Sequence, residues 1–296
     1  MNARLDWYGC ATYRLTLPQT TVMLDAYLDR VAGAAGPCLT PDAIDRADWI
    51  LVGHSHFDHL YGAERIAVNT GATVVGSYES VRVLADQGVP EEQLIAVSGG
   101  ERVKLADGVH ATVIPSLHSC VWSHAGVQPI DEVCIGDLGL TLQEQRARFG
   151  ELIAWLANLS EPVREHLLVS NQNPRGDGGA LAYLIETPEG SLLYQDSAGG
   201  WRGLLDGLRP DVAILAAAGR PNVDGQPFQG STLGWVLEEA AVLQPRVIVP
   251  THHDDWMPGF STPIDTAPVH KALAEAGSLT RLVDLDHLDG WDPFAG

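Results

Sequence analysis

A dense group of potential metal ligands follows a short apolar run in the first quarter of the chain. The run Trp49–Gly53 has the length and composition of a buried strand, and the next six residues read His-Ser-His-Phe-Asp-His. Alternate side chains of an extended segment point to the same side, so His54, His56 and Asp58 can face one point. His59 lies off this parity and needs a turn to reach a second point nearby. Imidazole and carboxylate groups bind zinc and similar divalent ions, so the sequence predicts a metal site at this strand end.

Apolar alternation and turn residues predict an α/β fold in which strands are joined in several places by helices. Asp107-Gly108, between two alternating runs, is a strong hairpin signal. The two halves of the chain look alike, because each has strands first and strand–helix units afterwards. Helices are expected at residues 60–68, 80–87, 231–243 and 267–276, and strands at residues 4–8, 11–17, 21–25, 48–53, 73–76, 94–97, 102–105, 109–114, 180–186, 191–195, 211–217, 246–249 and 281–285.

The section at residues 119–179 does not continue this alternation. It contains a predicted helix at residues 142–159 and a glycine-rich stretch at 171–179. We expect one domain that spans residues 1–296, with this section as an insertion. The insertion either covers a pocket or is a surface excursion without a role, and the sequence leaves both alternatives open.

Composition and charge exclude several classes of partner. The formal net charge of −20 argues against nucleic acid and against anionic membranes, which attract basic surfaces. No apolar run approaches the ~18 residues that a transmembrane helix needs. The first six residues lack the apolar core of a signal peptide, so we expect a cytoplasmic protein.

Polar side chains follow three further predicted strands. His118, Asp196 and the pair His252-His253 each stand directly after one of them. Ligands of α/β proteins bind outside the carboxyl ends of strands, so these loops have a spatial reason to meet the histidine cluster. Together they offer enough donors for two metal ions, which at a separation of ~3.5–4 Å can hold a bridging hydroxide. A ligand that bridges two metals needs two oxygen atoms, which favours Asp196.

The order of these features resembles the metallo-β-lactamase superfamily. The resemblance rests on the HxHxDH motif at residues 54–59, the lone His118, Asp196 in a DSAG turn, and a histidine after a buried strand. It covers nearly the whole chain apart from residues 119–179. It implies an αββα sandwich of two similar halves, with a dinuclear metal site at one edge of the sheets.

The resemblance also implies a role for each ligand. Besides binding a metal, Asp58 would orient the attacking hydroxide and later accept a proton. The last ligand of the family commonly follows a Pro-x step, which favours His252 after Pro250-Thr251 over His253. His253 would then either support a ligand from behind or line the pocket. The first metal would be bound by His54, His56 and His118, the second by Asp58, His59 and His252, and Asp196 would bridge the two.

The N-terminal residues narrow the resemblance to one branch. Residues 5–12 and the segment Met23-Leu24-Asp25 are similar to the branch of ascorbate-phosphate lactonases and N-acylethanolamine phospholipase D. The opening strand there reads W-x-G-H-A-S, and Cys10 stands in place of that histidine. Asp25 is expected either to support a ligand histidine or to be an ordinary turn carboxylate. Cys10, Cys38, Cys120 and Cys134 are predicted to be buried small residues, Cys120 being close to a candidate ligand.

Other residues could reach the substrate. Arg220 follows a predicted strand and could meet an anionic substrate, the alternative being an exposed loop residue. His124 lies near His118 in the sequence, and Trp122 and Trp256 could line the pocket. Tyr194 and Trp201 are expected to be packing residues, and His110, His166, His270 and His287 to be structural or surface residues.

The leading hypothesis is a metal-dependent hydrolase that uses a hydroxide bound to two metals to attack a small-molecule ester, lactone or phosphodiester. Flavodiiron oxidoreductases of this superfamily carry Glu at the second ligand position, where this chain has His56, which favours zinc. Manganese, iron and nickel accept the same ligands. The alternatives are a non-catalytic metal-binding or sensor protein and a metal-dependent oxidoreductase. The sequence leaves the substrate and the oligomeric state open.

Overall fold

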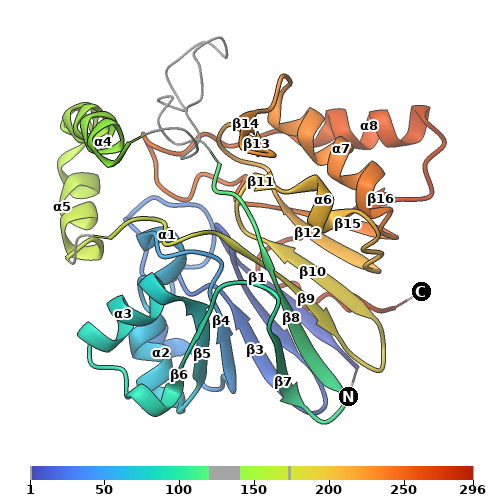
Figure 1. Cartoon of the computed structure of the whole chain (residues 1–296), viewed down its shortest axis with the longest axis horizontal. Coiled ribbons are helices and arrows are strands. Elements are labelled where there is room, and N and C mark those ends of the chain that lie inside the picture. Colours follow the sequence, from blue (N-terminus) through green and yellow to red (C-terminus); the bar gives the residue numbers. More distant parts are fainter. Residues whose placement is uncertain (1, 120–140, 173–174, 296) are drawn as a thin grey trace.

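Two β-sheets form the centre of the molecule in the computed structural model, which describes residues 2–119, 141–172 and 175–295 (Figure 1). The first sheet has the strand order β1-β2-β3-β4-β5-β6. Its first three strands pair antiparallel, and β3 to β6 pair parallel. The strands are β1 (Arg4–Gly9), β2 (Thr12–Thr16), β3 (Thr21–Leu24), β4 (Trp49–Leu51), β5 (Thr73–Ser77) and β6 (Leu94–Val97).

The second sheet has the order β16-β15-β12-β10-β9-β8-β7 and repeats the plan of the first. Its strands β7 to β10 pair antiparallel, and β10, β12, β15 and β16 pair parallel. A small third sheet joins β11 (Gly199–Gly200), β13 (Asn222–Val223) and β14 (Gln226–Pro227). The strands of the second sheet are β7 (Arg102–Ala106), β8 (Val109–Pro115), β9 (Leu181–Glu186), β10 (Ser191–Gln195), β12 (Val212–Ala216), β15 (Val247–Thr251) and β16 (Arg281–Leu282).

Successive side chains of a buried strand point to opposite faces of its sheet, and this produces a core in layers. In β12, Ile214 packs between the two sheets, whereas its neighbours Ala213 and Leu215 pack under helices on the outer face. Helices α2 (Ala63–Thr70) and α3 (Tyr78–Asp86) cover the outer face of the first sheet, and α7 (Thr232–Leu243) and α8 (Ala267–Glu275) cover the second. The predicted αββα sandwich of two similar halves is therefore confirmed.

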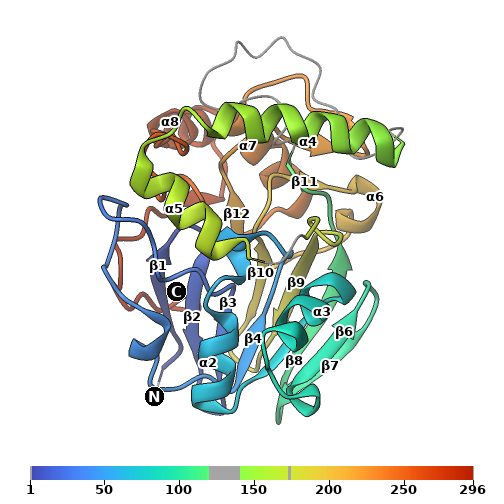
Figure 2. The ribbon, with the colours of Figure 1, turned by 90° about the vertical axis from the view of Figure 1, so that its left-hand side faces the viewer.

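Between β8 and β9, in the section predicted to interrupt the alternation, the described residues form two helices. They are α4 (Leu142–Leu156), which begins with a capping box formed by Thr141 and Glu144, and α5 (Glu161–Ser170). The prediction of one helix at 142–159 was incomplete, because α4 ends at Leu156 and a second helix follows. Figure 2 shows both helices on the side of the molecule that faces the viewer. None of the described helices is long and apolar enough to cross a bilayer.

The inserted helices are held by an apolar cluster that reaches the first sheet. Leu159 and Val163 are buried in one cluster with Tyr27, Trp256 and Met257. The insertion therefore packs on the residues that follow β3 and β15, and β15 leads directly to one of the candidate ligands.

Candidate metal centre

The four predicted ligand loops meet at one edge of the two sheets. His54 follows β4, His118 follows β8, Asp196 follows β10 and His252 follows β15. Because β10, β12 and β15 are parallel, their carboxyl ends lie at the same edge. A Cβ atom at Gly53 would lie only 2.1 Å from Asp196 Oδ2, so glycine is needed where the two sheets bring these loops together.

The first group of donors consists of His54, His56 and His118. One ring nitrogen of each lies within 4.8 Å of those of the other two. His54 Nε2 and His56 Nδ1 are 3.2 Å apart. The ring centroid of His118 lies 4.5 Å from that of His54 and 4.6 Å from that of His56. Three nitrogens at these separations can converge on a single metal ion.

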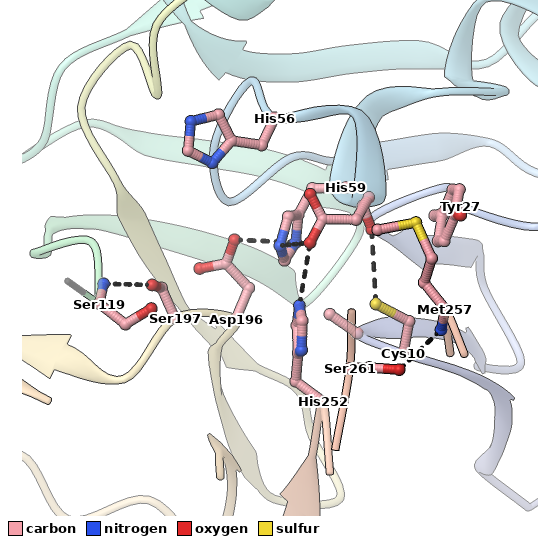
Figure 3. Close-up of polar contacts among 12 residues, drawn as sticks. Cys10, Tyr27, His56, His59, Ser119, Asp196, Ser197, His252, Met257 and Ser261 are labelled. Carbon is pink, nitrogen blue, oxygen red and sulfur yellow. Dashed lines mark hydrogen bonds and ion pairs between the residues drawn. The ribbon is translucent and has the colours of Figure 1, made fainter. Parts of the chain in front are cut away.

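The second group consists of Asp58, His59 and His252. Asp58 Oδ2 lies 3.2 Å from His252 Nε2 and 3.5 Å from His59 Nε2. Figure 3 shows Asp196 and His252 both pointing toward His59. Asp58 and His59 are brought here by the four-residue helix α1 (Phe57–Leu60), which begins directly after His56. The expectation that Asp58 continues the extended parity of the histidines was wrong, since this residue is already helical.

Asp196 lies between the two groups. Its Oδ2 atom is 2.5 Å from His54 Nδ1 and 3.2 Å from His59 Nδ1. The side chain is fully buried, and Oδ1 has no hydrogen-bond partner among the described residues. A buried carboxylate oxygen without a donor is costly. The position and the unpaired oxygen of Asp196 both fit a residue that contacts metal ions.

The pKa values of the first group favour the form of histidine that binds metals. Burial lowers the pKa of His54 well below its usual range and also lowers that of His56. Burial, followed by the charge of His56, lowers the pKa of His118 to about 4. These three imidazoles are therefore neutral at pH 7, and a neutral imidazole is the metal ligand.

In the second group, carboxylates surround the imidazole ring of His59 and favour its protonated form. Burial opposes ionisation of Asp58, but His59 and His252 outweigh burial and hold its pKa well below the usual range. Burial also opposes protonation of His59, but Asp58, Asp25 and Asp196 hold its pKa well above the usual range. Burial raises the pKa of Asp196. Three carboxylates thus gather around one imidazolium, and a divalent cation would supply the same positive charge.

Asp25 and Tyr194 support the second group from behind. Asp25 Oδ2 lies 2.5 Å from His59 Nδ1 and accepts a hydrogen bond of 2.6 Å from the Tyr194 hydroxyl. Gly53 N donates to Asp25 Oδ1 over 2.8 Å. Burial raises the pKa of Asp25 to about 6. Asp25 is therefore no exposed turn carboxylate. Tyr194 was interpreted from the sequence as a packing residue, but its hydroxyl also donates a hydrogen bond to Asp25. The one feature of the sequence that could have indicated this role is its position on β10, two residues before Asp196.

The structure separates His252 from His253. His252 Nε2 faces Asp58, and this hydrogen bond raises the pKa of His252, although burial acts in the opposite direction. His253 instead stacks on Trp7 with ring centroids 5.1 Å apart. His252 has a positive φ of 61°, which turns consecutive side chains in different directions.

Cys10 is a neighbour of the second group for which the sequence predicted no contact with the ligands. It is buried, as predicted, but its Sγ atom lies within 4.8 Å of a carboxylate oxygen of Asp58 and a ring nitrogen of His252 (Figure 3). The thiol contacts the Asp58 carbonyl oxygen at 3.7 Å. The only signal in the sequence was its position, where the similar branch has a histidine. For Cys38 the prediction of burial was wrong, because that side chain is exposed.

The remaining candidates have varied surroundings. Trp256 contacts the site, because its ring centroid lies 5.0 Å from that of His252. Arg220 is half-buried, and its Nε has no hydrogen-bond partner among the described residues. His166 bonds to the Tyr27 hydroxyl at 2.7 Å, and His270 bonds to Asp284 at 2.6 Å. His124, Trp122, Cys120 and Cys134 lie outside the described residues.

Comparisons with known proteins agree with this architecture. A profile described as "Beta-lactamase superfamily domain" matches residues 20–150. A metal-dependent hydrolase of Pyrobaculum arsenaticum is 34% identical over 116 residues, which cover 39% of this chain and 51% of that protein. The chain spans about half the length of the Pyrobaculum relatives that it matches.

A second relative and one solved structure cover nearly the whole chain. A metal-dependent hydrolase of Methanopyrus kandleri is 25% identical over 259 residues, which are 86% of each protein. The solved structure is Igni18, a metallo hydrolase from the archaeon Ignicoccus hospitalis, with a TM-score of 0.61 and 16% identity. This similarity covers 98% of this chain and 97% of Igni18.

Proposed function

The chain belongs to the metallo-β-lactamase superfamily, and we propose that it is a hydrolase that uses two divalent metal ions. One observation carries the proposal: seven donor side chains from four loops converge at one sheet edge, where the buried Asp196 contacts the rings of both His54 and His59. The first metal would be held by His54, His56 and His118, the second by Asp58, His59 and His252, and Asp196 would contact both.

The residues present fit metal ions. The imidazoles of the first group are already in the neutral form that binds metals, and in the second group a metal ion would take the place of the proton on His59. The unpaired Asp196 Oδ1 gives the bridging residue a free donor atom. Nitrogen and oxygen donors of this kind favour zinc, although manganese, iron and nickel accept them too. When bound, a metal pair supplies a nucleophile at neutral pH and polarises the bond under attack.

The protein's own residues have separate tasks in this proposal. Asp58 stays ionised because His59 and His252 hold its pKa well below the usual range. It can therefore orient a water molecule through one carboxylate oxygen and accept a proton during turnover. Asp25 and Tyr194 fix the ring of His59, so that its Nε2 faces the site.

We propose that the whole chain acts as one domain in which α4 and α5 flank the entrance to the site. The packing of Leu159 and Val163 with Trp256, which contacts His252, supports this arrangement. The substrate would be a small-molecule ester, lactone or phosphodiester, and we retain cytoplasmic residence as part of the proposal.

An activity screen with controlled metal content tests the proposal. The purified protein would be stripped with a chelator and assayed against lactones, phosphodiesters, thioesters and β-lactams before and after addition of zinc, manganese or iron. We expect hydrolysis of one substrate class that disappears with the metal and returns with it. Hydrolysis that survives complete metal removal contradicts the proposal. Stoichiometric metal without hydrolysis favours a sensor, and metal-dependent oxidation favours an oxidoreductase.

The contact between Asp25 and His59 yields a quantitative prediction. Asp25→Asn removes the negative charge behind the ligand ring and is expected to weaken metal binding by about 10- to 100-fold, measured by competition with a chromogenic chelator. The matched control is Asp45→Asn, since Asp45 is an exposed carboxylate that pairs with Arg14 at 3.1 Å. If both variants bind metal as tightly as the wild type, Asp25 has no supporting role.

A further inference from the structure

The inserted section returns to the second sheet along a strap, residues 175–179, that is fixed to the metal loop. Ser55, which stands between His54 and His56, makes two hydrogen bonds to this strap. Its hydroxyl donates to the Gly176 carbonyl over 2.6 Å, and its backbone N–H donates to the Asp177 carbonyl over 2.9 Å. Arg175 is the first residue of the strap. Its neighbour Gly176 is in direct contact with the ligand loop, and this contact fixes the backbone next to Arg175.

The guanidinium of Arg175 is only partly used by the protein. Nη2 donates to the Ser170 carbonyl at the end of α5. Nε and Nη1 are buried, and neither has a hydrogen-bond partner among the described residues. Buried donors are almost always paired, because an unpaired one loses its hydration without compensation. Two unpaired donors on one cation thus point to a ligand that the protein chain does not supply.

The hydrogen bonds from Ser55 to the strap bring Arg175 near the proposed metal site, and the charges that act on Arg175 agree with this position. Burial lowers the pKa of Arg175, and the carboxylates of Glu64, Asp58 and Glu79 oppose that shift. In turn, the charge of Arg175 contributes to the lowered pKa of His56, behind the larger effect of burial. Arg175 therefore lies within electrostatic reach of one proposed ligand of each metal.

These carboxylates have other partners. Glu79 pairs with Arg82 at 2.8 Å, and Glu64 pairs with Arg65 at 3.5 Å. Asp58 is a proposed metal ligand, so a metal would offset its charge. None of the three accepts a hydrogen bond from the free donors of Arg175. The two unpaired donors of Arg175 are therefore not used by these carboxylates.

We propose that Arg175 binds an anionic group of the substrate, a carboxylate or a phosphate, beside the metal centre. The inference rests on the proposed hydrolase function and narrows its substrates to anionic compounds, so that neutral esters and lactones are poor substrates. Arginine suits this task, because it stays charged when buried and its N–H groups match the oxygens of both anions. The strap holds the guanidinium in place before substrate binds, which reduces the entropic cost of recognition.

The test is anion binding by zinc-loaded protein, measured by titration calorimetry with acetate and with inorganic phosphate as separate probes. Arg175→Gln is expected to weaken the binding of at least one anion by about 10- to 100-fold, and Arg175→Lys by less. The anion whose affinity falls more, acetate or phosphate, identifies the group that Arg175 recognises. The matched control is Arg164→Gln, because Arg164 lies on α5 and its guanidinium donates to the carbonyls of Ala157 and Leu159.

Metal content and melting temperature of each variant complete the experiment. If zinc binds stoichiometrically but Arg175→Gln binds both anions like the wild type, the inference is overturned and the proposed function stands. The inference is likewise overturned if the zinc-loaded wild type binds neither anion, or if Arg175→Gln lowers only the melting temperature. If the wild type binds neither zinc nor another divalent metal ion, the proposed function itself fails.

Discussion

Asp196→Asn is expected to lower kcat/KM of the metal-dependent hydrolysis by at least about 1,000-fold, which corresponds to a loss of ~4 kcal/mol of transition-state stabilisation. Asn keeps the shape of the side chain but lacks the charge that can join two metals. Because Asp196 Oδ2 contacts the rings of both His54 and His59, the substitution affects both groups of donors. The measurement is steady-state kinetics on the substrate found in the activity screen.

Thermal unfolding distinguishes loss of metal from loss of fold. Burial raises the pKa of Asp196 in the folded, metal-free protein, so its ionised form destabilises that state as pH rises above the unfolded-state pKa. The neutral Asn variant should thus melt, without metal, no lower than the wild type at pH 8. Zinc at 100 times its dissociation constant should stabilise the wild type by ~2.7 kcal/mol and the variant much less.

Asp211→Asn is the matched control for this prediction. Asp211 precedes β12 and accepts hydrogen bonds from Ser191 at 2.8 and 2.9 Å, at the opposite end of the strand from the metal edge. It should keep the zinc response. An Asp196→Asn variant that retains both zinc stabilisation and activity would refute the bridging role, and one that unfolds without metal would locate the effect in folding instead.

His252→Ala is expected to lower kcat/KM by at least about 100-fold, whereas His253→Ala should lower it by less than about 3-fold. His252 Nε2 faces Asp58 at 3.2 Å, while His253 packs on Trp7. Loss of the latter stacking should reduce stability by about 1 kcal/mol. Kinetics, zinc affinity and denaturant unfolding of the two variants provide a direct comparison. Equal losses of activity, or a larger loss for His253→Ala, would reverse the assignment.

Much of the fold was predictable because local patterns determine it. Apolar runs followed by polar ligands predicted β4, β8, β10 and β15, a buried apolar run predicted β12, and Asp107-Gly108 predicted the β7–β8 hairpin that the structure contains. The topology of α/β sheets then gave the four ligand loops a common edge. These features depend on neighbours in sequence and on general rules of chain connection, so one sequence is enough to predict them.

The contacts behind the metal ligands could not be predicted in this way. The bond from Tyr194 to Asp25 joins residues 169 positions apart, and its sequence signal is one tyrosine in a buried strand. Cys10 reaches Asp58 and His252 only because the β1–β2 turn packs against the loop after β15. The unpaired donors of Arg175 depend on how the strap folds back onto Ser55. Tertiary packing, not local propensity, decides such contacts.

The central claim is that this edge of the sandwich holds two metal ions joined by Asp196. The most direct test is elemental analysis of wild-type protein and Asp196→Asn after saturation with zinc and removal of unbound metal. We expect two ions per chain in the wild type and fewer than two in the variant. A wild type that retains no metal, or a variant that retains two ions per chain, would contradict the claim.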